Sequence, residues 1–184
     1  QDAEVSIEEE SFHSCRIEGA DTTQEELNDI FRAKRREKKG DKMILNTYRA
    51  VKYLNQTLKR DVDTLVELWK IVTDGVCDNA GMSGERFRQG VVKVGSHEAP
   101  APELLDYCMK QFFHFYNEYN IENPYIKVAV VHFYFVYMHP FCDGNGRIGR
   151  LISTDFLIRS GLDNFSALTL SKTINETAQE YYQA

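Results

Sequence analysis

Residues 139–150 constrain the fold of this chain more than any other stretch; they read His-Pro-Phe-Cys-Asp-Gly-Asn-Gly-Arg-Ile-Gly-Arg. A run that is apolar nearly all round, 128–138, precedes them, and an apolar-periodic segment that ends at Gly161 follows them. Pro140 disfavours helical backbone at His139, which indicates that the first helix ends there. The stretch therefore predicts a helix, a glycine-rich loop and a second helix.

The glycines and arginines of this loop suit an anion. Gly144 and Gly146 permit backbone conformations in which successive N–H groups converge on one anion. A helix that begins near Gly146 adds unpaired N–H donors and roughly half a positive charge. Arg147 and Arg150 lie three residues apart on its first turn, so both can face the same ligand. We therefore expect phosphate groups to bind here.

His139 and Asp143 add a base and a carboxylate to this loop. An unperturbed histidine has a pKa of about 6.5, which suits proton abstraction at neutral pH. Asp143 would repel bare phosphate and is useful chiefly if a divalent cation bridges the two. An ordinary loop or a fragment of a calcium loop is the alternative, but no acidic residues follow at calcium-loop spacing. The joint spacing predicts a site for metal-bound polyphosphate beside a base.

The stretch resembles the signature of the Fic family, HPFx(D/E)GNGRxxR, and matches every fixed position, whereas Cys142 stands at a variable one. The resemblance implies an all-α fold, a Fic-type helical bundle with one small β-hairpin called the flap. It implies a single Fic domain over 1–184, in which 139–150 is the signature loop. It also implies a protein adenylyltransferase, which transfers AMP from ATP to a Tyr, Thr or Ser hydroxyl of a target protein.

The resemblance further implies a role for each site residue. His139 would deprotonate the acceptor hydroxyl, and Asp143 would hold the cofactor Mg²⁺ across the α- and β-phosphates. Arg147 would aid the β-phosphate, Arg150 would take the γ-phosphate, and Tyr182 belongs to a tyrosine pair that the family places near the adenine. The full set expected to bind the nucleotide is Phe141, Asp143, Gly144, Asn145, Gly146, Arg147, Arg150 and Tyr182.

Residues 1–20 are expected to form an inhibitory helix that precedes the Fic core. Residues 6–9, Ser-Ile-Glu-Glu, read as a capping box and predict the helix start, and Gly19 predicts a left-handed helix end. Ser14 to Gly19 match the (S/T)xxxE(G/N) motif of the Fic inhibitory helix, for which a plain helix end is the alternative reading. The resemblance implies autoinhibition, in which Glu18 pairs with the arginine assigned to the γ-phosphate.

Residues 81–101 break the helical pattern, and 86–99 within them are read as the flap region. Short β-branched runs around a glycine predict a small hairpin. In the family the flap pairs with a segment of the target through backbone hydrogen bonds, a mode that needs little sequence preference. An ordinary surface hairpin is the alternative. The residues expected to dock the target are Val91, Val92, Lys93, Val94, Gly95, Ser96 and His97.

Apolar residues at helical spacing predict helices over most of the remaining chain. Their approximate ranges are 22–31, 40–54, 63–75, 102–115, 124–138, 146–161 and 171–184. The length of 124–138 favours a central helix over a buried strand, the basic run 34–39 is read as a solvated helix face, and 164–169 as a loop. Because the chain stops in mid-helix, we expect it to lack a C-terminal part.

Composition narrows the class of protein. The chain has 184 residues, of which 42% are hydrophobic and 27% charged, with a net charge of −6, so a nucleic-acid partner is not expected. No stretch is long and apolar enough for a membrane span. Four cysteines without CxxC spacing suggest reduced thiols and a cytoplasmic location. A homo-oligomer stays open.

Four other functions remain open at this point. Glu18 makes the reverse reaction, a de-AMPylating hydrolysis, an alternative, because some family members use that carboxylate to orient water. Relatives that transfer phosphate carry Lys where this chain has Gly146. Phosphocholine transfer from a CDP-linked donor is a more distant option. The last alternative is a latent nucleotide-binding interaction module without turnover.

Overall fold

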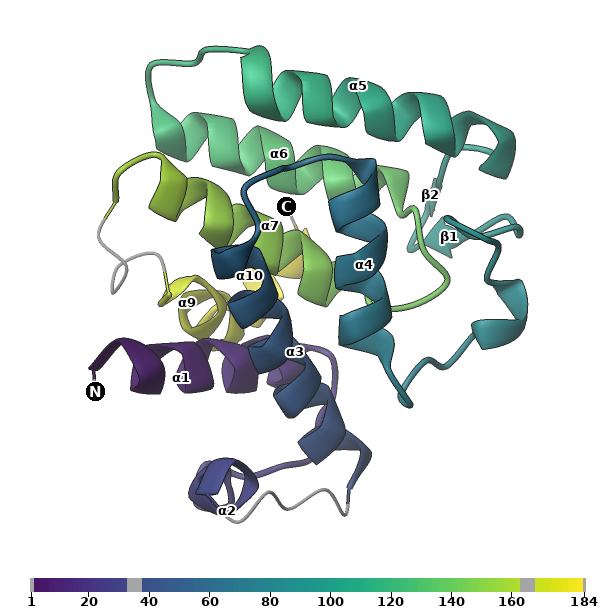
Figure 1. Cartoon of the computed structure of the whole chain (residues 1–184). Helices are drawn as coiled ribbons and strands as arrows, with labels where there is room; N and C mark the ends of the chain where they lie inside the picture. Colours follow the sequence, from purple (N-terminus) through teal and green to yellow (C-terminus); the bar gives the residue numbers. More distant parts are fainter. Residues whose placement is uncertain (1, 33–37, 163–167, 184) are drawn as a thin grey trace.

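Helices form nearly all of the regular structure, and one short hairpin forms the rest (Figure 1). The computed structural model describes residues 2–32, 38–162 and 168–183. Its α-helices are α1 (Asp2–Ile17), α2 (Leu27–Arg32), α3 (Lys39–Gln56), α4 (Val62–Thr73), α5 (Leu105–Glu118), α6 (Pro124–Met138), α7 (Asn145–Arg159), α9 (Leu170–Glu176) and α10 (Ala178–Gln183). Two 3-10 turns, η1 (Ala80–Met82) and η2 (Pro102–Leu104), and strands β1 (Lys93–Val94) and β2 (His97–Glu98) complete it. The all-α prediction with one hairpin is confirmed.

The larger hydrophobic cluster joins α3, α4, α5, α6 and α7. Side chains that are at most 1% exposed come from each of the last four helices, among them Leu65, Met109, Val131, Phe135 and Ile148. In Figure 1, α7 lies between α6 and α1. Because α6 and α7 pack along each other, the loop between them is anchored to this core at both ends.

A second hydrophobic cluster fixes the N-terminal helix against the bundle. Phe12 and Cys15 of α1 pack with Ile30 of α2 and Ile44 of α3, and Ile7 of α1 joins the larger cluster. Burying side chains of this size contributes roughly 1.5–3 kcal/mol each. The position of the residues that follow α1 is therefore set by packing against the bundle.

A buried carboxylate ties α1 to α7 and α9. Glu10 is only 1% exposed, and it accepts hydrogen bonds from the Ser171 backbone N–H at 3.0 Å and from the Ser171 hydroxyl at 2.5 Å. The Thr154 hydroxyl lies at 3.4 Å. Burial raises the pKa of Glu10 to about 7, although these hydrogen bonds and Arg150 act in the opposite direction.

The predicted start of the first helix is wrong. Helix α1 begins at Asp2, so residues 6–9 lie inside it and do not cap it. The first turn is held from outside, because Glu4 pairs with Lys52 at 2.7 Å and accepts a hydrogen bond from the Tyr48 hydroxyl, both on α3. The predicted left-handed residue after the helix is confirmed, since Gly19 has φ +83°.

The flap hairpin is present but shorter than its predicted residues. Strand β1 pairs antiparallel with β2 around a bend at Gly95, whose φ is +59°. Val91 and Val92 precede the strands, but the Val92 carbonyl still accepts a hydrogen bond from the Ala99 N–H at 3.0 Å. This hydrogen bond continues the pairing of the two chain segments by one residue pair beyond the strands, away from the bend.

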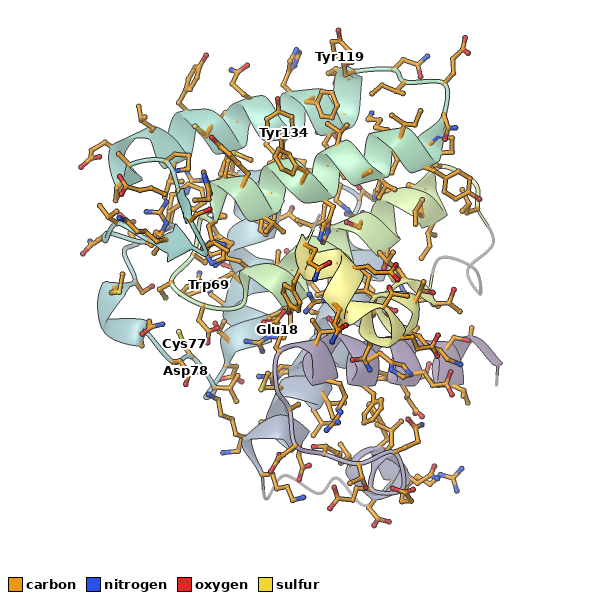
Figure 2. The ribbon with its side chains drawn as sticks, turned by 180° about the vertical axis from the view of Figure 1, so that it is seen from behind. Glu18, Trp69, Cys77, Asp78, Tyr119 and Tyr134 are labelled. Atoms are coloured by element: carbon orange, nitrogen blue, oxygen red, sulfur yellow. The ribbon has the colours of Figure 1, made fainter. Side chains whose placement is uncertain are left out.

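Helix α6 begins at Pro124 as predicted, with the Asn123 side chain accepting from the Tyr125 N–H at 2.9 Å. It packs against α5 and α7, but it is not buried all round. Phe133 is 60% and Tyr134 51% exposed, and Tyr134 projects from the helix in Figure 2. Aromatic and apolar residues therefore also cover a face that points away from the core.

Three smaller outcomes complete the comparison with the sequence. The segment predicted as one helix over 171–184 forms two, α9 and α10. Of the basic run 34–39, only Lys38 and Lys39 lie within the described residues. Of the predicted loop 164–169, only the last two residues are described. None of the helices in the described ranges has both the length and the hydropathy needed to span a bilayer.

Candidate active site

His139 sits where α6 ends, in a backbone conformation that suits a functional residue. Its φ of 46° and ψ of 59° are left-handed, and it is the one non-glycine residue with positive φ in the described ranges. The imidazole Nδ1 lies 3.3 Å from the Val136 carbonyl oxygen, which assigns the ring proton to Nδ1 and leaves Nε2 as an acceptor. Burial lowers the pKa of His139, and nearby Arg88 lowers it further. Burial therefore favours the uncharged form of the ring.

Arg88 holds this strained residue in place. The side chain is 2% exposed, and its guanidinium donates to the carbonyl oxygens of His139 at 2.7 Å, Gly90 at 2.6 Å and Pro100 at 2.6 Å. Its own N–H donates to the Pro140 carbonyl at 2.9 Å. Arg88 thus links the base of the flap to the histidine. Arg88 lies in the segment 86–99 that is read as the flap region, and no local sequence pattern marks a buried guanidinium.

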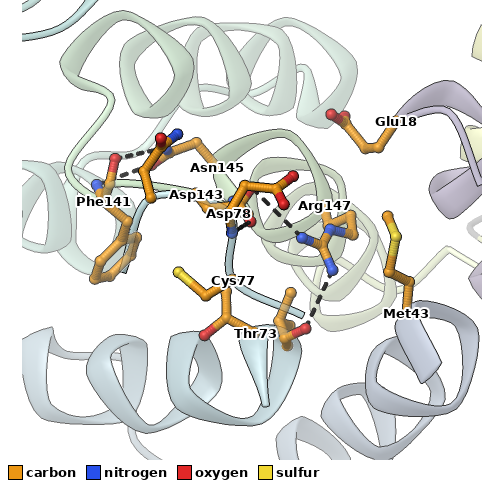
Figure 3. A network of polar contacts seen from close by, with 12 residues as sticks. Glu18, Met43, Thr73, Cys77, Asp78, Phe141, Asp143, Asn145 and Arg147 are labelled. Atoms are coloured by element: carbon orange, nitrogen blue, oxygen red, sulfur yellow. Dashed lines mark hydrogen bonds and ion pairs between the residues drawn. The ribbon is translucent and has the colours of Figure 1, made fainter. Parts of the chain in front are cut away.

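The signature loop is braced internally. The Asn145 side chain accepts from the Phe141 N–H at 3.0 Å and donates to the Phe141 carbonyl at 2.9 Å (Figure 3). The Phe141 ring stacks on Trp69 with centroids 5.2 Å apart, and Trp69 Nε1 donates to the Asp143 carbonyl at 3.1 Å. The Asn145 amide is thus engaged with the loop itself. Trp69 of α4 thus takes part in holding the loop.

The first turn of α7 offers an anion site. Gly144 is its N-cap with φ 81°, and the first N–H groups of any helix lack partners within the helix. Arg147 is 2% exposed and donates to the Val72 carbonyl at 3.1 Å. Its buried Nε has no hydrogen-bond partner among the described residues. A buried positive charge with an unused donor fits an anionic ligand that completes its surroundings.

Asp143 lies beside this turn and has the features of a single-carboxylate magnesium ligand. Its Oδ1 accepts from the Gly144 N–H at 2.6 Å, and its Oδ2 accepts from the Asp78 N–H at 2.9 Å (Figure 3). Arg147 Nη2 lies 3.7 Å from Oδ1. No group of three His, Cys, Asp or Glu side chains gathers at metal-binding distance in the described part of the chain. One carboxylate fits Mg²⁺, which usually takes its other ligands from phosphates and water.

Glu18 reaches across to the end of this site. Its Oε1 lies 2.5 Å from Arg150 Nη2, and Arg150, only 1% exposed, also donates to the Ser14 hydroxyl and carbonyl at 3.0 Å each. A Cβ placed on Gly146 would overlap Glu18 Oε1. The carboxylate therefore lies over the first turn of α7, close to the position expected for phosphate, and Figure 2 shows Glu18 facing the bundle.

The tyrosine pair lies near this carboxylate. Tyr182 is 67% exposed, its ring centroid is 5.1 Å from that of Tyr181, and burial and then Glu18 raise its pKa. The Tyr181 hydroxyl lies 2.9 Å from His132 Nε2, and His132 Nδ1 lies 3.1 Å from the Ser153 hydroxyl. His132 is thus satisfied by hydrogen bonds, as expected. Tyr182 has the exposure that a contact with a ligand requires.

The flap is joined to α6 one residue before that helix ends. His97 Nε2 lies 2.9 Å from the Tyr137 carbonyl, and the two rings are 4.0 Å apart between centroids. Val91 is 60% and Val94 37% exposed. Lys93 and Glu98 pair across the hairpin at 3.4 Å. The hairpin is therefore attached to α6 two residues before His139, and its valine side chains remain exposed to solvent.

Comparison with known proteins agrees with this arrangement. Residues 45–157 match the Fic/DOC family. The chain is 35% identical over 122 residues to "Protein adenylyltransferase Fic" of Aedes aegypti, a match that takes in 64% of this chain and 24% of that protein. It thus spans about a quarter of the length of the curated relatives it matches.

Solved structures share the fold. A Fic family protein from Desulfovibrio desulfuricans G20 superposes with a TM-score of 0.82 at 22% identity, over 98% of this chain and 56% of that one. Fic-1 (residues 134–508) from C. elegans superposes with a TM-score of 0.74 at 19% identity, over 95% of this chain and 62% of that one. With its signature loop, its helical fold and the family match over most of its length, this chain belongs to the Fic/DOC family.

Proposed function

We propose that this chain is a protein adenylyltransferase that moves AMP from ATP to a Tyr, Thr or Ser hydroxyl of a target protein. The observation that carries the proposal is the convergence of a neutral imidazole, an anion-binding helix start and two buried arginines on one loop. The relatives named above as adenylyltransferases support the reaction type. The acceptor protein, any homo-oligomer and the cytoplasmic location stay predictions.

The reaction needs a proton acceptor and a held triphosphate. His139 Nε2 takes the proton of the acceptor hydroxyl, and that oxygen attacks the α-phosphorus of ATP. The bond from the α-phosphorus to the oxygen that bridges to the β-phosphate breaks, and pyrophosphate leaves. The N–H groups of the first turn of α7, together with Arg147 and Arg150, hold the phosphates in line, and such positioning and charge neutralisation are the main needs of phosphoryl-type transfer.

Asp143 would hold Mg²⁺ in this proposal. When bound, the ion would supply neutralisation of the phosphate charge. In the structure the N–H groups of Gly144 and Asp78 each donate to one oxygen of this carboxylate. This arrangement supports Asp143 as the single protein carboxylate that binds the metal.

We further propose that Glu18 inhibits the transfer. A carboxylate and a γ-phosphate oxygen would compete for Nη2 of Arg150, since Nε and Nη2 of this guanidinium already donate to Ser14 and Nη2 also donates to Glu18. The Glu18 carboxylate also lies over Gly146, on the side where phosphates would meet the helix start. ATP would then bind weakly, or with its α-phosphate out of line for attack.

The identity of the transferred group tests the proposal. Glu18→Gly protein is incubated with a target lysate and with ATP labelled on either the α- or the γ-phosphate. Label on protein from the α-position alone is the expected result, and it should vanish in Glu18→Gly/His139→Ala. Label from the γ-position would show phosphate transfer, and label from neither would show a module that binds without turnover.

A second candidate, removal of AMP from a modified target, rests on the same carboxylate. Glu18 acts electrostatically on His139 and tends to raise its pKa, which supports a carboxylate that acts in the same site as the base. Purified AMP-modified target distinguishes the two directions of reaction. If release of AMP depends on Glu18 and exceeds transfer by Glu18→Gly, hydrolysis is the main activity.

A further inference from the structure

Two thiols that are far apart in the sequence meet beside the signature loop. Cys77 and Cys142 are 65 residues apart, and their Sγ atoms lie 3.7 Å from each other. Cys77 lies on the segment that follows α4, at the periphery of the molecule in Figure 2, and Cys142 occupies the variable position of the signature. Both are reduced and partly exposed, so a small oxidant can reach them.

The remaining cysteines lack these properties. Cys15 is completely buried under α1, where its thiol contacts the Thr47 hydroxyl at 3.3 Å. Cys108 is partly exposed on α5, away from the segment after α4. The pair formed by Cys77 and Cys142 is therefore the one place in the described chain where two thiols lie within contact of each other.

Polar contacts already hold the two segments together around this pair. The Asp78 N–H donates to Asp143 Oδ2 at 2.9 Å, and Asn79 Nδ2 donates to the Cys142 carbonyl at 3.4 Å. A disulfide has an S–S length of about 2.05 Å. The sulfurs must therefore approach by roughly 1.7 Å, and the two hydrogen bonds above already hold their segments side by side.

We propose that Cys77 and Cys142 form a site of reversible oxidation. A low-molecular-weight disulfide oxidises the two thiols to an internal disulfide, which restrains Asp143 and weakens binding of Mg-ATP. The formation of the bond stands on the geometry alone. The effect on Mg-ATP rests on the proposed function, because it takes Asp143 as the ligand of the metal.

The reaction is two steps of thiol–disulfide exchange. One cysteine thiolate attacks a sulfur of oxidised glutathione, and a mixed disulfide forms while the first glutathione leaves as a thiolate. The second cysteine attacks the protein sulfur of that mixed disulfide, and the second glutathione leaves. Two protein thiols are oxidised, one glutathione disulfide is reduced to two thiols, and the two thiol protons pass to the departing glutathiones.

The disulfide would act on Asp143 through its immediate neighbours in the chain. Cys142 precedes Asp143, and Cys77 precedes the residue whose N–H holds Oδ2 of the same carboxylate (Figure 3). A covalent link would fix both segments and keep that hydrogen bond from opening. The carboxylate would then lose the freedom to turn towards a bound metal, whereas the flap and His139 would keep their contacts with Arg88.

The first test follows the bond. The protein is treated with a glutathione redox buffer, and its free thiols are counted by maleimide labelling and by the mass of the intact chain. Wild type should fall from four thiols to two without retaining glutathione, and Cys108→Ser should fall from three to one. Cys77→Ser should stop at a mixed disulfide or stay reduced. Wild type that keeps four thiols, or that carries glutathione without an internal bond, overturns the proposal.

The second test measures the effect of the disulfide on nucleotide binding. It uses the Glu18→Gly background, so that the carboxylate of Glu18 does not compete with phosphate. Affinity for Mg-ATP is measured by titration calorimetry before oxidation, after it, and after reduction. Oxidation should weaken binding by about 10-fold, a change of about 1.4 kcal/mol, and reduction should restore it. Glu18→Gly/Cys77→Ser should respond to neither treatment. An internal disulfide that leaves the affinity unchanged overturns the regulatory effect.

The two proposals fail in different ways. If affinity for Mg-ATP changes with oxidation but no AMP is transferred by the reduced protein, the proposed function is wrong and the oxidation site stands. If the reduced protein transfers AMP and no internal disulfide forms, the oxidation site is wrong and the function stands. Reduced protein that does not bind Mg-ATP at all contradicts the function and the regulatory effect, and the thiol count then decides the bond by itself.

Discussion

The carboxylate of Glu18 and the guanidinium of Arg150 lie 2.5 Å apart, although 132 residues separate them in the sequence. Arg150 is fully enclosed, whereas the Glu18 side chain keeps about a third of its surface in solvent. The contact therefore joins a fixed, buried cation to a more accessible anion at the end of a helix. A phosphate oxygen could displace the anion without disturbing the arginine.

Replacing His139 should abolish transfer and spare nucleotide binding. In His139→Ala the loop keeps its helix start and both arginines, so affinity for ATP should stay within about twofold, whereas loss of a general base lowers rates by roughly 10²–10⁴-fold. Rates are measured in the Glu18→Gly background, with His114→Ala on α5 as the exposed control. Transfer near the parental rate would contradict the role of base.

Replacing Asp143 should impair the use of Mg²⁺ in the transfer reaction. Asp143→Ala should weaken productive binding of Mg-ATP, and an excess of Mg²⁺ should not restore the rate, because this carboxylate is the expected protein ligand. Transfer is measured as a function of Mg²⁺ concentration, with Asp74→Ala, an exposed carboxylate after α4, as the control. Undiminished activity that needs no metal would refute the assignment.

Arg88 should act on the position of His139 and not on the nucleotide. Arg88→Ala leaves three or more carbonyl groups without their donor, which should cost roughly 2–5 kcal/mol of unfolding free energy. At temperatures where the variant stays folded, kcat should fall while the Kd for ATP changes little. Denaturant titration and transfer kinetics are compared with Arg86→Ala, whose side chain is more exposed. Equal loss of kcat in both variants would remove the positioning role.

Glu10 should give the protein a stability that falls as pH rises through the weakly acidic range. Burial raises its pKa in the folded state to about 7, above the ordinary 4.5. Between these values the folded state binds more protons than the unfolded state, so unfolding free energy should decline from about pH 4.5 to 7, by up to a few kcal/mol. Denaturant titrations across this range should show a flatter curve for Glu10→Gln than for wild type. An identical slope would show that another group is responsible.

How far the sequence could predict the site depends on whether its contacts are local. The end of α6 at His139, the left-handed Gly144 and the start of α7 follow from residues that adjoin one another. Gly146, expected to share the conformational role of Gly144, instead lies inside α7 and has no positive φ. Glu18 was assigned through a family motif, since no spacing rule joins it to Arg150. Arg88 and the pair of cysteines escaped prediction because their partners lie 51 and 65 residues away and meet only in the folded bundle.

The misplaced helix start has a similar cause. Residues 6–9 satisfy a local capping pattern, but α1 continues to Asp2 because Glu4 is held by Tyr48 and Lys52 from α3. A local pattern cannot register such tertiary contacts, which add stability to a turn that would fray alone. Helix α6 is apolar on nearly all sides, so its sequence pattern does not distinguish the exposed face with Phe133 and Tyr134 from the buried face.

The central claim is that Glu18 holds Arg150 away from ATP, and the rate of AMP transfer in four proteins tests it most directly. Wild type, Glu18→Gly, Arg150→Ala and the double variant are compared with α-labelled ATP. Glu9→Gly, which replaces an exposed glutamate of the helix that precedes Glu18, serves as the control for a glycine substitution. Because Arg150 keeps its hydrogen bonds to Ser14 when Glu18 is removed, and Glu18 is itself about a third exposed, all forms with Arg150 should stay folded. We expect Glu18→Gly to exceed wild type and Glu9→Gly by at least about 10-fold, and both Arg150→Ala proteins to be inactive. Equal rates for wild type and Glu18→Gly, or full activity in the double variant, would contradict the claim.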